Sequence, residues 1–161
     1  MGQAPARSEA QVLLCASCHR LGRCRLGLVD ERLIEDGVSL TKLTCGLDHE
    51  GGPGVAHGGW IAASFDEILG HLPILCGRMA VTSVLQVEFL KPVPIERNLM
   101  VRAWRDKYEN NRWYNKAEMR LVTTDALLAR ANGVFVERDS SHFERHRNWL
   151  ADQDRAAPDS S

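Results

Sequence analysis

Residues 51–59 combine several glycines and one proline with a histidine, and Gly58 and Gly59 follow His57 directly. We expect a helix to begin at Gly58. The first N–H groups of a helix have no intrahelical partners and lie at the positive end of its dipole, so they stabilise a negatively charged oxygen. Glycine at both positions lets a ligand carbonyl approach the backbone. The pattern predicts an oxyanion hole, and the alternative is a glycine-rich helix entry that binds no ligand.

The carboxylate of Asp66 is the second candidate group. It lies on a strip of small residues along the expected helix, formed with Ala62, Ala63 and Gly70, beside an apolar flank where an unpaired carboxylate is costly. A carboxylate retained there is a candidate general base or nucleophile. The alternative is an ordinary helix acid at the edge of the core. Glu67 is the nearest rival, but the side of the helix that it shares with Ser64 and His71 is expected to be solvated.

The separation of these groups along the helix constrains how they could cooperate. Asp66 follows Gly58 by eight residues, which is about 12 Å along a helix axis. One substrate carbonyl therefore cannot contact both groups within a single chain. If they act together, Asp66 comes from one protomer and Gly58 or Gly59 from its partner. We predict an active site across a dimer interface.

A helix over residues 58–72 must position both groups. Apolar residues recur at helical spacing along one side of it, and Pro73 is expected to end it. The apolar side consists of Ile61, Phe65, Ile68 and Leu72.

Strand-like runs surround this helix, and a short amphipathic helix over residues 141–151 closes the chain. Hairpin turns are expected at Asn110-Asn111 and Thr124-Asp125. The fold class is α+β, a curved antiparallel sheet wrapped around one long central helix. Because one helix covers only one face of the sheet, a homodimer or homotetramer is expected. The expected strands cover residues 26–34, 38–47, 80–91, 99–104, 113–121 and 127–137.

Composition narrows the classes of protein. The 161 residues fit one domain over residues 11–151, with a flexible N-terminus at 1–10 and a flexible tail at 152–161. A net charge of −1 gives no electrostatic reason to expect a nucleic-acid partner. No apolar run is long enough for membrane insertion, and no signal peptide is recognised. The odd number of cysteines fits a reducing compartment, so a cytoplasmic location is expected.

The chain resembles a known family on the motif Pro53-Gly54-x-x-His57-Gly58-Gly59, followed by a helix with an acid nine residues after the histidine. This motif is similar to that of the PaaI-like hotdog-fold thioesterases, in the 4-hydroxybenzoyl-CoA thioesterase superfamily. The similarity continues through residues 82–92 and spans about residues 15–137. It implies a hotdog-fold enzyme that hydrolyses acyl-CoA thioesters and requires no metal or bound cofactor.

The resemblance also implies a role for each matching residue. The amide of Gly59, or of Gly58 with it, polarises the thioester carbonyl, and His57 positions this loop. Asp66 attacks the carbonyl carbon or activates the water that does. Thr82 matches a hydroxyl that orients this water in relatives. A thioester is already activated, so polarisation and one base are sufficient.

Substrate binding is expected in an apolar tunnel between helix and sheet, with the CoA phosphates near Lys91 or Arg97. The chain departs from its relatives at one position. Several relatives carry Asn or Gln about six residues before the histidine of the motif, where this chain has Gly51. The neighbouring Glu50 is a different chemical group. This departure leaves open how the attacking water is held.

Two other functions are alternatives for this fold. Hydratases and dehydratases generally need an Asp and a His about five residues apart in the loop before the helix, and Gly52 stands at that position relative to His57. This class is therefore disfavoured. A non-catalytic acyl-CoA-binding hotdog module stays open, because a fold does not fix a function.

Cys15, Cys18 and His19 match the spacing of a c-type haem attachment motif, which is disfavoured because such attachment normally requires export. Together with Cys24 they could instead form a zinc site. The preferred interpretation is a structural N-terminal turn packed on the sheet. Two further cysteines are expected to be buried: Cys45 and Cys76.

Overall fold

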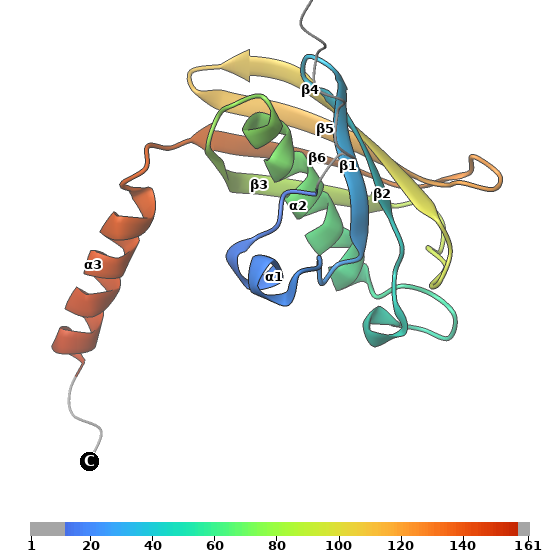
Figure 1. Ribbon diagram of the computed structural model, residues 1–161, viewed down its shortest axis with the longest axis horizontal. Coiled ribbons are helices and arrows are strands. Elements are labelled where there is room, and N and C mark those ends of the chain that lie inside the picture. Colours follow the sequence, from blue (N-terminus) through green and yellow to red (C-terminus); the bar gives the residue numbers. More distant parts are fainter. Residues whose placement is uncertain (1–11, 158–161) are drawn as a thin grey trace, which may run out of the picture.

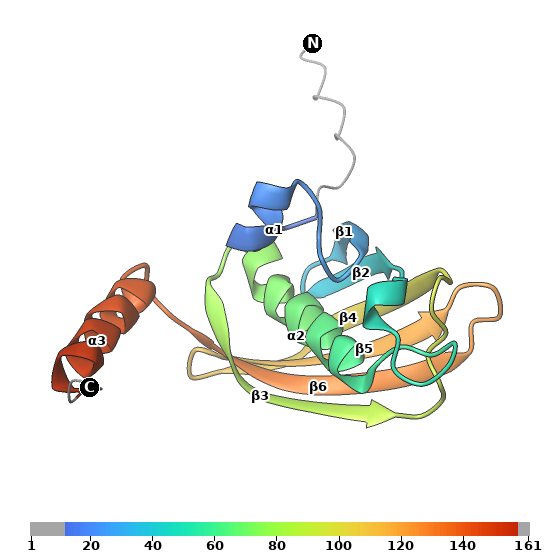
Figure 2. The same cartoon turned by 90° about the horizontal axis from the view of Figure 1, so that it is seen from below.

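The computed structural model describes residues 12–157 and contains one six-stranded antiparallel sheet that curves around a long helix (Figures 1 and 2). The predicted flexible segment 1–10 and the end of the predicted tail, residues 158–161, lie outside the described residues. The helices are α1 (Ala16–Leu21), α2 (Gly58–Leu75) and α3 (His142–Ala156), with a 3-10 turn at Leu47–His49. The strands are β1 (Leu28–Glu35), β2 (Val38–Leu43), β3 (Ala80–Phe89), β4 (Leu99–Glu109), β5 (Arg112–Leu121) and β6 (Leu127–Glu137).

The order of strands across the sheet is β1-β2-β4-β5-β6-β3. Strand β3 follows α2 in the chain but pairs with β6 at the far edge, so it is not a neighbour of β4. The predicted hairpin turns are confirmed, because Asn110 and Asn111 both adopt positive φ, at 52° and 58°, and Asp125 adopts 58°. Strand β3 thus lies alongside α2, and its outer edge, like that of β1 at the other end of the sheet, is unpaired among the described residues.

Helix α2 continues three residues beyond its predicted end, and Pro73 lies within its last turn. A proline has no N–H, so the carbonyl of Leu69 loses its usual intrahelical donor. The side chain of Asn115, on β5, replaces that donor, because its Nδ2 donates to the Leu69 carbonyl at 3.0 Å. The prediction that Pro73 stops the helix was therefore wrong, and the reason lies in a strand far away in the sequence.

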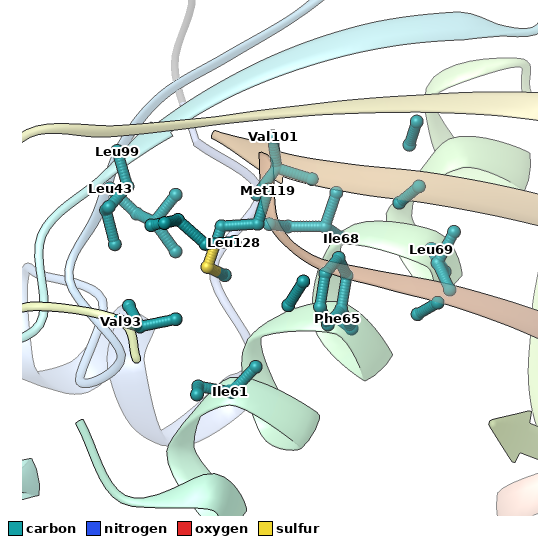
Figure 3. Packing of buried hydrophobic residues seen from close by; sticks show 14 of the residues in the cluster. Leu43, Ile61, Phe65, Ile68, Leu69, Val93, Leu99, Val101, Met119 and Leu128 are labelled. Carbon is teal, nitrogen blue, oxygen red and sulfur yellow. The ribbon is translucent and has the colours of Figure 1, made fainter. Parts of the chain in front are cut away.

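The core lies between α2 and the concave face of the sheet (Figure 3). The predicted apolar side of α2 is buried, with Phe65, Ile68 and Leu72 fully enclosed. The side of α2 that carries Ser64 and His71 was predicted to be solvated, and this prediction was wrong: both residues are buried, and His71 bonds to Glu31 of β1. What stays partly exposed is the small-residue strip that includes Asp66.

The convex face of the sheet carries charged side chains in cross-strand pairs. Arg130 on β6 bonds to Glu88 on β3 at 2.8 Å, and Lys116 pairs with Asp106 at 2.9 Å. Such a face can remain in water. It therefore gives less reason for oligomerisation than expected, and the homodimer or homotetramer stays a prediction.

Helix α3 extends away from the sheet in both views (Figures 1 and 2), and none of its residues is buried. It runs to Ala156, beyond the predicted end at residue 151. Among the described helices, none combines the length and the apolar character needed to cross a bilayer.

Candidate active site

The loop before α2 is held by its own backbone and by one carboxylate. The Gly51 N–H donates to the Val55 carbonyl at 2.8 Å, and the Gly54 N–H donates to Oε1 of Glu50 at 2.6 Å. The His57 N–H then donates to the His49 carbonyl at 2.8 Å. These bonds fix the path of the chain into the helix, so the first amides of α2 have a defined direction.

His57 is the N-cap residue of α2, and its Nδ1 accepts a hydrogen bond from the Gly59 N–H at 2.8 Å. A side chain that bonds to the second or third amide of a helix is a usual N-cap arrangement. The Gly59 amide is therefore engaged by the protein itself. The Gly58 N–H makes no hydrogen bond within residues 12–157, and it is the amide best placed to meet a ligand oxygen.

A shallow groove of about 310 Å³ opens at this helix start. Its lining includes Gly58, the half-exposed ring of Phe89 at the end of β3, and the exposed Lys91. Arg97 does not line the groove, and its guanidinium donates to the carbonyl of Glu96 at 3.3 Å. The structure thus brings only one of the two predicted phosphate contacts next to Gly58.

Asp66 projects from the middle of α2 towards β3, where the Thr82 hydroxyl donates to its Oδ1 at 2.8 Å. A register shift between Thr82 and Val84 leaves Ser83 unpaired in the ladder with β6. Such a bulge changes which way the neighbouring side chains point. Thr82 and Leu85 consequently both face the helix, although a regular strand would place them on opposite faces.

The structure does not bring Asp66 and Gly58 together within one chain. Both residues lie on α2, so their separation along its axis is about 12 Å, as the sequence predicts. Asp66 is joined by Thr82, and Gly58 by the groove near Phe89 and Lys91. A single protomer therefore presents two half-sites.

A side chain at position 51 would collide with the backbone of His57. A Cβ atom at this position would lie 2.9 Å from the Cα of His57, which is too close for the backbone to tolerate without moving. Glu50 does not substitute for the amide found in relatives, because its carboxylate is bonded to the Gly54 N–H. Any group that holds a water here must come from elsewhere in the site.

A buried charged cluster next to α2 was missed by the sequence analysis. His71 donates from Nδ1 to Glu31 on β1 at 2.8 Å and from Nε2 to Glu67 at 3.0 Å, and the Thr41 hydroxyl donates to Glu31 at 3.3 Å. Burial opposes the charge on His71, but its bonds to the two carboxylates outweigh burial and raise the pKa of His71 to about 9. The hydrogen bond from His71 lowers the pKa of Glu67. The i, i+4 spacing of Glu67 and His71 was visible in the sequence, but the pairing with Glu31 was not.

Cys15 is the N-cap residue of helix α1 and Cys18 lies within this helix, which runs beside α2 (Figures 1 and 2). Among residues 12–157, no group of three or more His, Cys, Asp or Glu side chains is arranged as metal ligands would be. The zinc arrangement with Cys15, Cys18, His19 and Cys24 is therefore not assembled. Cys45 is buried as predicted, whereas Cys76 is only half-buried.

Comparison with solved structures identifies the fold. The architecture is shared with the PaaI protein of Escherichia coli, with a TM-score of 0.66, 18% identity, and coverage of 78% of this chain and 86% of that one. It is also shared with a hypothetical thioesterase of Streptococcus pneumoniae solved with coenzyme A, with a TM-score of 0.63, 16% identity, and coverage of 68% and 84%. The curved sheet around one long helix is a hotdog fold, as predicted.

The family follows from the sequence. The profile of the thioesterase superfamily matches residues 53–143, which include the helix start and Asp66. The chain belongs to the thioesterase superfamily. It is 30% identical over 90 residues to the acyl-coenzyme A thioesterase THEM4 of Bos taurus, a match that covers 56% of this chain but only 37% of that relative's length.

Proposed function

We propose that this protein hydrolyses acyl-CoA thioesters to the free acid and CoA. The observation that carries the proposal is the presence, on one helix, of an oriented carboxylate and of an amide that has no hydrogen-bond partner among the described residues. Asp66 is held at Oδ1 by Thr82, and its Oδ2 makes no hydrogen bond within the described residues. The Gly58 N–H points from the positive end of α2. These are the two groups that thioester hydrolysis requires.

In the proposed reaction the thioester carbonyl oxygen accepts a hydrogen bond from the Gly58 N–H. Asp66 attacks the carbonyl carbon directly, or it removes a proton from the water that attacks. The amide stabilises the negative charge that develops on the oxygen. Collapse of the tetrahedral intermediate expels the CoA thiolate. If Asp66 is the nucleophile, water then cleaves the acyl-enzyme anhydride and restores the carboxylate.

The two half-sites are proposed to meet in a homodimer. Strand β3 is an edge strand within this chain, and Val84 and Phe89 on it are exposed by 53% and 57%. An unpaired, partly apolar edge favours pairing with another strand. Asp66 lies at the Thr82 end of β3 and Gly58 at its Phe89 end, so an antiparallel pairing of two β3 strands is proposed to bring the partner's Gly58 towards Asp66.

The same arrangement suggests where the substrate lies. The acyl chain is proposed to follow the small-residue strip of α2, where glycine and alanine leave room beside Asp66. The CoA phosphates are proposed to lie near Lys91, which lines the groove at Gly58. Arg97 is less suited to this contact, because it lies outside the lining of that groove.

Known proteins of this fold support the assignment of the two side chains. Two further structures of the Streptococcus pneumoniae thioesterase are variants in which an aspartate or a threonine is replaced by alanine, and these positions are 16 residues apart. Asp66 and Thr82 have the same separation. The structure of that protein with coenzyme A shows that it binds the CoA part of such a substrate. The coenzyme A complex supports a CoA thioester as the substrate.

The test is thiol release from acyl-CoAs of varied chain length and aromaticity. In an Asp66→Asn variant, kcat/KM is expected to fall at least about 100-fold, because the base or nucleophile is lost. Glu67→Gln is the matched control, since it removes the adjacent carboxylate of the same helix, and it should retain turnover. Undiminished hydrolysis by Asp66→Asn would overturn the mechanism.

A non-catalytic acyl-CoA-binding module is the alternative. The observation that favours it is Gly51, which stands where several relatives carry an Asn or Gln side chain. Wild-type protein that binds acyl-CoAs in calorimetry but releases no thiol from any of them would establish this alternative.

A further inference from the structure

Two cysteines lie side by side in a segment outside the match to the thioesterase superfamily. Cys15 is the N-cap residue of α1, and Cys18 is the third residue of that helix. Side chains three residues apart on a helix are neighbours. Their Cys-x-x-Cys spacing is the one found in redox-active dithiols.

One arginine contacts both sulfur atoms. The Arg25 backbone N–H donates to Cys18 Sγ at 3.3 Å, and the side-chain Nε donates to the same sulfur at 3.4 Å. The Nη2 atom of Arg25 reaches Cys15 Sγ at 3.9 Å. Donors and positive charge at a sulfur favour the thiolate, which is the reactive form of cysteine. The guanidinium therefore bridges the two sulfurs and stabilises the thiolate of Cys18.

Cys18 differs from Cys24 and Cys45 in the direction of its pKa shift. Burial alone would raise the pKa of Cys18, but its hydrogen bonds with Arg25 and Cys15 outweigh burial and lower it. Burial raises the pKa of Cys24, and it raises the pKa of Cys45 to about 11. Cys18 therefore combines a neighbouring thiol with a stabilised thiolate.

The pair is accessible through a cavity of about 390 Å³ between the N-terminal segment and α2. Cys15 is half-buried and Cys18 is buried, and both sulfur-bearing residues line this cavity. Glu67 and Ala63 of α2 form the opposite wall. A small disulfide can therefore approach the dithiol from the cavity side.

We propose that Cys15 and Cys18 are a redox-active dithiol that forms a reversible intramolecular disulfide by exchange with a low-molecular-weight disulfide. The Cys15 thiolate attacks one sulfur of the disulfide R–S–S–R, and the released thiolate takes up the proton that Cys15 lost. The Cys18 thiolate then attacks the Cys15 sulfur of the mixed disulfide and expels the second R–S⁻. The protein loses two electrons and two protons, and the small disulfide becomes two thiols. The proposal is independent of the proposed hydrolase activity.

The experiment equilibrates the reduced full-length protein in buffers of reduced and oxidised glutathione, quenches it with acid and alkylates the free thiols. Intact-mass analysis is expected to show the loss of two of the five alkyl adducts in one step. Peptide mapping should place the bond between Cys15 and Cys18. Five adducts at every glutathione ratio, or a bond that involves Cys24 or joins two chains, would overturn the proposal.

Three variants sharpen this result. Cys24→Ser, which removes the third thiol lining the cavity, should still form the disulfide. Cys18→Ser should stop at a mixed disulfide with glutathione on Cys15. Arg25→Gln should slow disulfide formation at neutral pH at least about threefold, because less thiolate is present. An unchanged rate in Arg25→Gln would contradict the role assigned to the guanidinium.

Discussion

Gly58 is the first residue of α2, a position where the N–H has no carbonyl within the helix to bond. Proline is tolerated at this position and lacks the N–H, and the extended backbone of His57, with ψ 136°, suits a residue before proline. A Gly58→Pro variant is therefore expected to fold normally yet to lose about 100- to 1,000-fold in kcat, the usual effect of deleting one oxyanion donor. Steady-state kinetics with the preferred acyl-CoA, together with thermal unfolding, would measure both effects.

The matched control is Gly58→Ala, which keeps the amide. Its Cβ would lie 3.6 Å from the Phe89 ring, which is an ordinary contact. This variant should retain most of the activity. Equal loss in both variants would mean that space at Gly58, and not its N–H, is what matters, whereas full activity in Gly58→Pro would exclude the amide as a donor.

At the same scale, Asp66 could be predicted from the sequence and the charge of His71 could not. Asp66 stands on a strip of small residues whose helical spacing is local information. The environment of His71 depends on Glu31, which is 40 residues away in the chain and reaches it only when β1 crosses α2. The choice of Gly58 rather than Gly59 as the amide that meets the substrate oxygen likewise depends on the bond between His57 and Gly59, which the sequence does not show.

At the scale of elements, the end of α2 depends on one bond from the sheet. Asn115→Leu removes the donor to the Leu69 carbonyl at similar size and is expected to cost about 1–3 kcal/mol in the free energy of unfolding. Pro73→Ala supplies a backbone N–H for the same carbonyl, so the cost of Asn115→Leu should shrink in that background. Chemical denaturation of the four proteins of this cycle would measure the coupling, and equal costs in both backgrounds would contradict it.

The packing of β1 on α2 is expected to make stability dependent on pH. His71 has a pKa of about 9 in the folded protein, above its ordinary value of 6.5, so the folded state binds this proton more tightly. Its contribution is fully present below pH 6.5 and is lost as pH rises towards 9, by roughly 3 kcal/mol at most. Chemical denaturation across this range should show the decline in wild type but not in His71→Gln, and a parallel decline in both would exclude His71 as its cause.

Strand β3 contains a bulge that the pattern of its sequence does not predict. Regular alternation in residues 80–91 predicts that Ser83, Leu85, Val87 and Phe89 share one face. The bulge at Ser83 breaks this phase, so Thr82 joins Leu85 on the helix side. A one-residue bulge is set by pairing with β6 and leaves no mark in the period of the sequence. The resemblance to known thioesterases identified Thr82, but periodicity did not.

At the scale of the whole molecule, the curved sheet around one helix could be predicted because each element carries its own periodicity. The place of β3 at the sheet edge could not, because neighbours along the chain are not always neighbours in a sheet. This placement matters for function. It puts Asp66 and Thr82 next to an unpaired edge and leaves Gly58 about 12 Å away along α2.

The central claim is that each active site takes Asp66 from one protomer and Gly58 from its partner. The most direct test mixes two inactive variants, Asp66→Asn and Gly58→Pro, by unfolding and refolding them together in equal amounts. Half of the dimers would be hybrids with one intact site each, so about a quarter of wild-type activity should return. If the mixture stays as inactive as the separate variants while hybrids are shown to form by mass, the composite site is contradicted.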